Sequence, residues 1–179
     1  MLLLWLRNAL QSMHNRQLAR GALLIALALA LQGLRLVVPL PLPVSTFMIG
    51  TLVHMMLTLT LQLNGRSTAL LLGALLPVTA YLQGQLAVPL LLPVVWLGNT
   101  VFVLALATLL NKKWLYLLLP PLVKAVLMLA GAWLVLELLA LEQLNVRRML
   151  LFAMSVPQLV TGIAGIALAK ALLRRLRNV

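Results

Sequence analysis

The chain has 179 residues, of which 64% are hydrophobic and 9% are charged, and its mean hydropathy is +1.11. Soluble domains carry about 25% charged residues, so this composition excludes a water-soluble fold and predicts an all-α integral membrane protein. It has 14 lysines and arginines but only two acids, Glu137 and Glu142, which argues against carboxylate-rich catalytic and metal sites. It has no cysteine, which excludes disulfides. We therefore expect no resident metal and no cofactor.

Residues 1–20 mix leucines with basic side chains and predict a short interfacial or cytoplasmic segment at the N-terminus. A membrane domain of six helices is expected over 21–172, because one crossing needs about 20 apolar residues. Residues 173–179 form a basic cytoplasmic tail. The expected spans, in chain order, are 21–38, 45–63, 67–83, 89–110, 114–139 and 149–172.

The basic residues lie between the apolar runs and not on one soluble face, so they indicate membrane topology and no nucleic-acid partner. With the N-terminus inside, only Arg147 and Arg148 fall in outer loops, and Arg35 and Lys124 fall within spans. The positive-inside rule therefore predicts that both termini are cytoplasmic. The remaining ten basic residues all fall on the inner side: Arg7, Arg16, Arg20, Arg66, Lys112, Lys113, Lys170, Arg174, Arg175 and Arg177.

Three polar side chains are expected near the middle of the membrane. Asn99, Lys124 and Gln158 each lie nine or ten residues, about 15 Å, into their spans, and His54 reaches a similar depth. Lys124 has no acidic partner at its own depth, since Glu137 follows 13 residues later in the same helix. Ionisable residues inside a membrane commonly mark substrate or ion pathways, so this set predicts a binding site.

Three further residues extend this candidate site. Trp96 precedes Asn99 by three residues and Thr161 follows Gln158 by three, so each pair is expected on one helix face. Arg35 lies near the outer end of the first span and is a candidate for the mouth of an outward cavity.

A purely structural interpretation also fits each of these residues. Lys124 and Arg35 can extend along their stems to the membrane surface. Asn99 and Gln158 can hydrogen-bond neighbouring helices without any ligand. His54 has no cluster of His, Asp or Glu around it, which argues against a metal site and is typical of a packing residue.

Small residues repeat along two spans. Ala22, Ala26 and Ala30 recur at every fourth position of the first span, and such spacing lets a second helix approach closely. We expect this face to receive a partner helix. Thr161, Gly165 and Ala169 repeat in the same way on the last span, where packing within the bundle is expected.

These features resemble the substrate-binding (S) components of energy-coupling factor (ECF) transporters, within a branch of undefined substrate. The resemblance covers the length, the six spans and their orientation. Short motifs add to it, namely Ala22-Leu-Leu-Ile-Ala26, Trp96-Leu-Gly-Asn99 and Ser155-Val-Pro-Gln158-Leu-Val-Thr161.

The resemblance implies a non-catalytic subunit of an ABC-type importer in the bacterial plasma membrane, which captures a vitamin or similar micronutrient outside. Its partners would be a transmembrane coupling (T) subunit, docked on the alanine repeat, and two cytoplasmic ATPases. The chain has no GxxxxGK[ST] phosphate loop of its own. The segment from Pro39 to Pro43 occupies the place of a loop that covers the pocket, and its prolines predict an extended polyproline II conformation.

Within this scheme Lys124 pairs with a carboxylate or other anionic group of the substrate. Asn99, Gln158 and Thr161 hydrogen-bond its polar edge, and Trp96 packs against it. Two alternatives remain open. One is a structural or assembly protein of five or six spans, such as a morphogenesis scaffold, and the other is a membrane enzyme acting on a lipid phosphate, for which the usual Asp-rich metal sites are missing.

Overall fold

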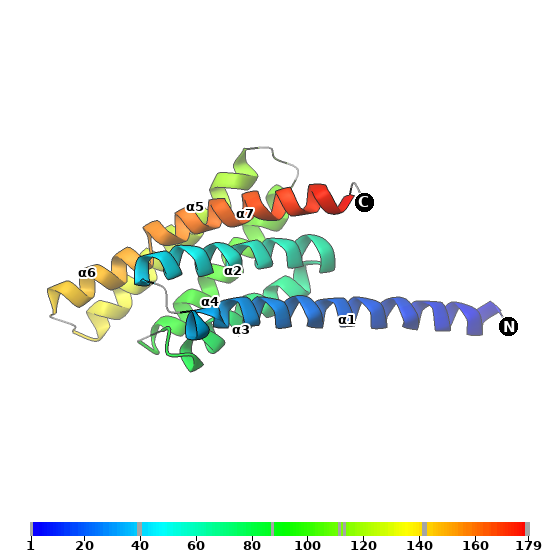
Figure 1. Ribbon diagram of the computed structural model, residues 1–179, viewed down its shortest axis with the longest axis horizontal. Helices are drawn as coiled ribbons and strands as arrows, with labels where there is room; N and C mark the ends of the chain where they lie inside the picture. The colour runs from blue at the N-terminus through cyan, green and yellow to red at the C-terminus, as the bar shows by residue number, and fades with distance from the viewer. Residues whose placement is uncertain are drawn as a thin grey trace.

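The computed structural model describes residues 2–38, 41–86, 88–110, 112, 114–140 and 143–177, with the side chains of all of these except 2–13 and 42. Every regular element in this part of the chain is a helix (Figure 1). In chain order the helices are α1 (Leu2–Val37), α2 (Leu42–Asn64), α3 (Arg66–Leu82), α4 (Leu91–Leu109), α5 (Leu115–Leu138), α6 (Leu144–Ala153) and α7 (Val156–Arg177).

The helices form a bundle that is compatible with a multi-pass membrane protein. Within the described ranges, five segments are long and apolar enough to cross a membrane, and α3 is a shorter apolar helix of 17 residues. The start of α1 and the end of α7 lie at the same end of the bundle (Figure 1). The five segments are His14–Val37, Pro43–Asn64, Leu91–Leu109, Leu115–Leu138 and Leu144–Arg177.

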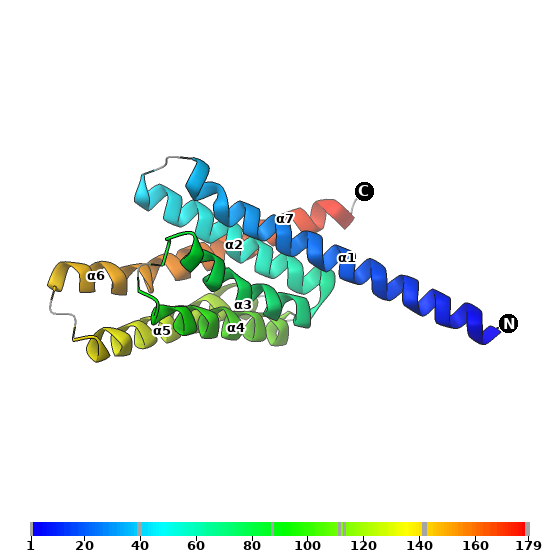
Figure 2. The ribbon, with the colours of Figure 1, turned by 90° about the horizontal axis from the view of Figure 1, so that it is seen from below.

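The N-terminal segment and the first span form one helix. Helix α1 runs unbroken through 36 residues, which corresponds to about 54 Å, well beyond the roughly 30 Å of a bilayer core. Its first turns project past the other helices (Figure 2). Likewise, the residues from 173 to Arg177 continue α7 and do not form a separate tail.

The sixth span, expected over 149–172, falls within one apolar segment, Leu144–Arg177, but this segment consists of two helices, because α6 and α7 are separated at Met154 and Ser155. Pro157 explains the break, since proline has no N–H to donate to the carbonyl of residue 153. The side chain of Gln158 donates to that carbonyl instead, with Nε2 3.3 Å from Ala153 O. A proline and the glutamine after it thus end one helix and begin the next.

The connection between α1 and α2 is shorter than predicted. Helix α2 begins at Leu42, so Pro43 lies in its first turn and the expectation of an extended segment is wrong for this residue. Pro41 has φ −53° and ψ 140°, which is polyproline II geometry. Several residues singled out from the sequence lie outside the described ones, namely Pro39, Asn111, Lys113 and Glu142.

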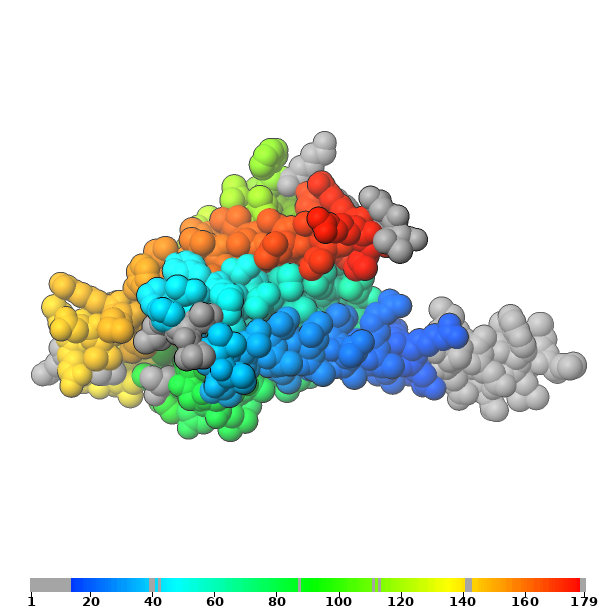
Figure 3. Space-filling model, in the orientation of Figure 1, coloured from blue at the N-terminus to red at the C-terminus, as the bar shows by residue number. Residues whose placement is uncertain are grey.

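Helix α2 is central in the bundle. It packs along α7 and also contacts α1, α3 and α4, while α5 packs between α4 and α7. Figure 3 shows α1, α2 and α7 side by side on one face. Phe102 and Leu106 of α4 and Ile166 of α7 belong to the main core cluster, which also includes residues of α1, α2, α3 and α5. Leu91, Met128 and Ala132 belong to a second cluster.

Candidate ligand-binding site

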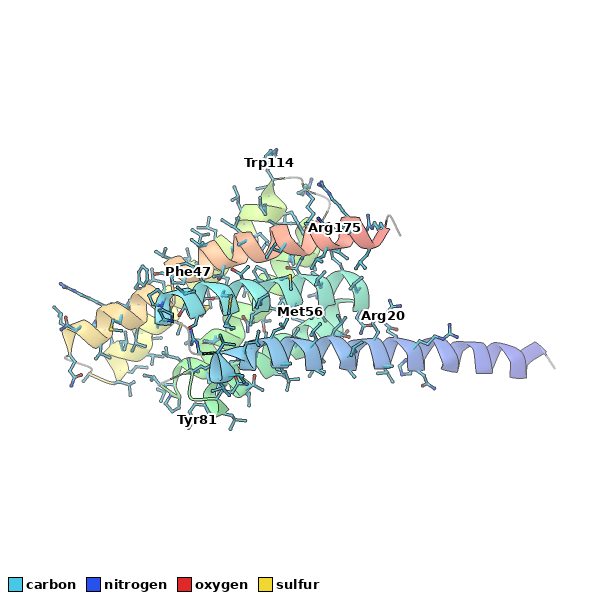
Figure 4. The ribbon with its side chains drawn as sticks, viewed as in Figure 1. Arg20, Phe47, Met56, Tyr81, Trp114 and Arg175 are labelled. Atoms are coloured by element: carbon cyan, nitrogen blue, oxygen red, sulfur yellow. The ribbon has the colours of Figure 1, made fainter. Side chains whose placement is uncertain are left out.

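A cavity of about 170 Å³ lies between α1, α2, α3, α4, α5 and α7. Its polar lining includes Arg35, from the last turns of α1, and Lys124, from the middle of α5. Figure 4 places Phe47 and Tyr81 toward the end of the bundle opposite Arg20 and Arg175. The full lining consists of Gln32, Arg35, Thr46, Ile49, Gly50, Val53, His54, Leu76, Pro77, Ala80, Gln85, Val95, Asn99, Lys124 and Gln158.

Lys124 is the innermost charged group, with 2% of its surface exposed. Its Nζ donates to Asn99 Oδ1 at 2.7 Å and lies 2.8 Å from His54 Nε2. The ring of Phe102 is a third neighbour, with its centroid 5.6 Å from Nζ, within the range of a cation–π contact. None of these partners carries a negative charge, so the ammonium group is solvated by polar groups but not neutralised.

The hydrogen bonds of His54 define its tautomer. Nδ1 lies 2.7 Å from the carbonyl oxygen of Gly50, one turn earlier in α2, and can only donate to it. Nε2 therefore carries no proton and accepts from Lys124. The imidazole is edge-on to Phe102, with ring centroids 5.0 Å apart, which fixes its orientation.

Asn99 is held by a carbonyl that a proline leaves free. Pro77 lies inside α3, so the carbonyl of Gly73, four residues earlier, has no N–H partner in its own helix. Asn99 Nδ2 of α4 donates to Gly73 O at 3.1 Å. This bond orients the amide of Asn99 with its oxygen toward Lys124. Asn99 is 2% exposed.

Thr161 supports the site from α7. Its hydroxyl donates to Pro157 O at 2.6 Å and lies 3.3 Å from His54 Nδ1. Thr161 thus contacts the imidazole of His54 but does not line the cavity itself. Gln158 does line it, and its amide nitrogen is engaged with Ala153 O.

Close helix contacts bring these groups together. A Cβ atom at Gly165 of α7 would lie 2.6 Å from His54 Cβ and 2.7 Å from the backbone nitrogen of Met55. At Gly50 of α2, a Cβ would lie 2.9 Å from Thr161 Cγ2. Helices α2 and α7 can therefore meet at this distance only because each has a glycine at the contact.

Arg35 links α1 to the start of α2 beside the cavity. Its Nε donates to Ser45 Oγ at 3.0 Å, and its Nη2 donates to Thr46 Oγ1 at 2.9 Å. Gln32, one turn earlier, donates to Leu76 O at 3.0 Å and joins α1 to α3. The lining thus contains two cations and several amides, and none of the residues that line it is acidic.

Most of the residues expected at the site lie together. Arg35, His54, Asn99, Lys124 and Gln158 line one cavity. Trp96 does not: it is 45% exposed and is not among the residues that line the cavity. Positions i and i+3 differ by about 60° around a helix, which is enough to turn Trp96 outward while Asn99 faces Lys124.

The sequence interpretation missed Gln32, Gly73 and Phe102. Gln32 is a lone amide in an apolar run, a signal that could have found it, since buried polar groups in membranes need partners. Gly73 contributes only its carbonyl, and its signal is Pro77 four residues later. Phe102 has no distinguishing signal in the sequence. Among the described residues, no three His, Cys, Asp or Glu side chains gather as a metal site requires.

No protein-family model, no curated protein and no solved structure matches this chain.

Proposed function

We propose that this protein is the substrate-binding component of an ECF-type importer and that it captures a small anionic micronutrient, such as a vitamin, from outside the cell. The observation that carries the proposal is the position of Lys124. Its ammonium group is buried at the inner end of a polar cavity and has two neutral partners and no carboxylate beside it.

The chemistry of the cavity favours an anion. Lys124 and Arg35 are its charged lining residues, and both are cations. Because Lys124 is buried, a carboxylate that reaches it interacts with its charged form more strongly than it would in water. Gln32, Gln85 and Gln158 supply amides that can hydrogen-bond the remaining polar atoms of the ligand.

The size of the cavity requires movement at its rim. Sites for small molecules usually have volumes of about 300–1,000 Å³, more than the roughly 170 Å³ found here. A ligand of vitamin size therefore fits only if the lining separates. Helices α1 and α2 can separate where Arg35 hydrogen-bonds Ser45 and Thr46, beside the connection between the two helices.

Coupling to ATP hydrolysis in other subunits explains the exposed alanine repeat. Ala22, Ala26 and Ala30 are all exposed on α1, as a docking face for the T subunit needs to be. The only acid among the described residues, Glu137, pairs with Arg147 at the ends of α5 and α6. The shortage of carboxylates argues against ion-coupled transport by this chain alone, and we place both termini in the cytoplasm.

Native mass spectrometry of the purified protein tests the proposal. The wild-type chain is expected to carry a small anionic molecule that Lys124→Met loses, since the substitution keeps the length of the side chain and removes its charge. Arg66→Met is the matched control, because Arg66 is an exposed cation at the start of α3 and does not line the cavity. A wild-type protein that carries no small molecule under these conditions, with Lys124→Met unfolding, would support the scaffold alternative instead.

A further inference from the structure

A second hollow, of about 580 Å³, lies at the end of the bundle that holds the start of α1 and the end of α7. Helix α7 contributes three cations to it, and Lys112, in the connection between α4 and α5, contributes a fourth. We call this site the basic hollow. It is lined by Leu61, Gln62, Leu110, Lys112, Tyr116, Lys170, Leu173, Arg174 and Arg177.

The charges of the basic hollow are not balanced within the described chain. Lys170, Arg174 and Arg177 are spaced four and three residues apart and share one face of α7, where like charges destabilise a helix. Glu137, the acid that the structure describes, is paired with Arg147 at the ends of α5 and α6. Positive-inside topology explains why cations lie at this end, but it does not explain why four of them converge on one hollow.

Tyr116 adds a neutral donor to these cations. The side chain is 6% exposed, and its hydroxyl oxygen accepts a hydrogen bond from Gln62 Nε2 at 2.8 Å. Its own O–H remains to donate, and Tyr116 lines the hollow. Together with the four cations, this hydroxyl is suited to phosphate oxygens.

An apolar hollow of about 470 Å³ adjoins the basic one and shares Tyr116, Lys170 and Arg174 with it. Its other lining residues are Trp114, Leu117, Ala167 and Ala171. Trp114 is exposed at the start of α5 (Figure 4), and tryptophan favours the boundary between headgroups and acyl chains. A ligand that occupies both hollows therefore has a polyanionic head and a hydrocarbon tail.

We propose that the basic hollow binds the phosphates of an anionic phospholipid and that the adjoining apolar hollow receives part of an acyl chain. Four converging cations match a headgroup with two phosphates, as in cardiolipin, better than one with a single phosphate. The site is separate from the cavity at Lys124 and does not depend on what that cavity binds.

Lipid binding to the purified full-length protein tests this proposal. In detergent, cardiolipin is expected to stay bound in native mass spectra and to raise the unfolding temperature, whereas phosphatidylcholine and inorganic phosphate do neither. The double variant Lys170→Gln/Arg174→Gln is expected to weaken cardiolipin binding about 30-fold, since each basic residue near a membrane surface contributes roughly a factor of five.

The matched control is Arg16→Gln/Arg175→Gln, which removes the same charge from exposed positions outside the hollow, one of them adjacent to Arg174. This control is expected to bind cardiolipin as the wild type does. Equal losses in the two double variants would overturn the proposal and leave only a diffuse basic surface. Equal stabilisation by inorganic phosphate would overturn it in favour of a site for free anions. If Lys170→Gln/Arg174→Gln does not fold, Lys112→Gln tests the opposite wall, and unchanged cardiolipin binding there would count against the site.

Discussion

Lys124 Nζ and His54 Nε2 lie 2.8 Å apart and form a hydrogen bond that joins the middle of α5 to the middle of α2. The bond requires a neutral imidazole, which His54 Nδ1 secures by donating to Gly50 O. With the imidazole neutral, the two residues together carry at most one positive charge. Asn99 Oδ1, 2.7 Å from the same nitrogen, orients the amine without neutralising it. An anion is the partner that this arrangement lacks.

Asn99→Asp is expected to weaken ligand binding while the bundle stays folded. The new carboxylate would lie beside Lys124 Nζ and take the place of the ligand's anionic group, so affinity is expected to fall at least tenfold, about 1.4 kcal/mol. Isothermal titration calorimetry with the molecule identified on the wild-type protein measures this loss. Asn15→Asp, at an exposed position of α1, is the control for added charge. Unchanged affinity in Asn99→Asp would show that Lys124 does not pair with the ligand.

The depth of the polar residues could be predicted from the sequence, because each residue advances a helix by about 1.5 Å. Counting from the span ends brought Asn99, Lys124 and Gln158 to one level, with His54 close to it. In the structure Lys124 hydrogen-bonds both Asn99 and His54, and Gln158 lines the same cavity. The rotation of each helix could not be predicted, since it depends on packing against neighbours. For this reason the outward position of Trp96 was missed.

Local backbone chemistry was only partly readable from the sequence. A proline within a helix leaves the carbonyl four residues earlier without its N–H partner, but which side chain binds that carbonyl depends on the tertiary structure. Gln158 donates to the carbonyl of Ala153, five residues earlier in the same segment. Asn99 of α4 donates to the carbonyl of Gly73 in α3. The break between α6 and α7 was missed because a proline does not by itself show where a helix ends: Pro77 lies within α3 and Pro120 within α5, whereas the helix breaks just before Pro157.

Gly165→Ala is expected to destabilise the protein and to disturb the site. The added Cβ would lie 2.6 Å from His54 Cβ and 2.8 Å from the carbonyl oxygen of Thr51, so α2 and α7 must separate. Overpacking of this kind costs about 1–3 kcal/mol. Thermal unfolding in detergent measures the change. Gly33→Ala is the control, because its Cβ would meet only Gln83 Nε2, at 3.5 Å. Equal unfolding temperatures for both variants would contradict the close packing of α2 and α7.

Ala22→Leu/Ala26→Leu is expected to abolish assembly with a T subunit and to leave folding and ligand binding unchanged. Both alanines are exposed, so larger side chains do not disturb the bundle, but they prevent close approach of another helix. Co-purification with co-expressed T and ATPase subunits measures assembly. Ala130→Leu enlarges an exposed alanine on α5 and is expected to assemble normally. Normal assembly of the double variant would exclude this face of α1 as the docking surface.

Arg35→Gln is expected to slow ligand association more than it destabilises the fold. The substitution removes one of the two cations that line the cavity, and with it the long-range attraction of an anionic ligand, while a glutamine amide can still reach Ser45 or Thr46. The wild-type association rate should fall as ionic strength rises, because salt screens this attraction, and the variant should be slower and less sensitive to salt. Stopped-flow measurement at low and high salt compares the two proteins. The control is Arg20→Gln, which should keep the wild-type salt dependence, because Arg20 lies at the other end of the bundle and donates to Leu63 O there. If Arg20→Gln and Arg35→Gln change the rate equally, Arg35 contributes only to the overall charge of the protein and does not guide the ligand into the cavity.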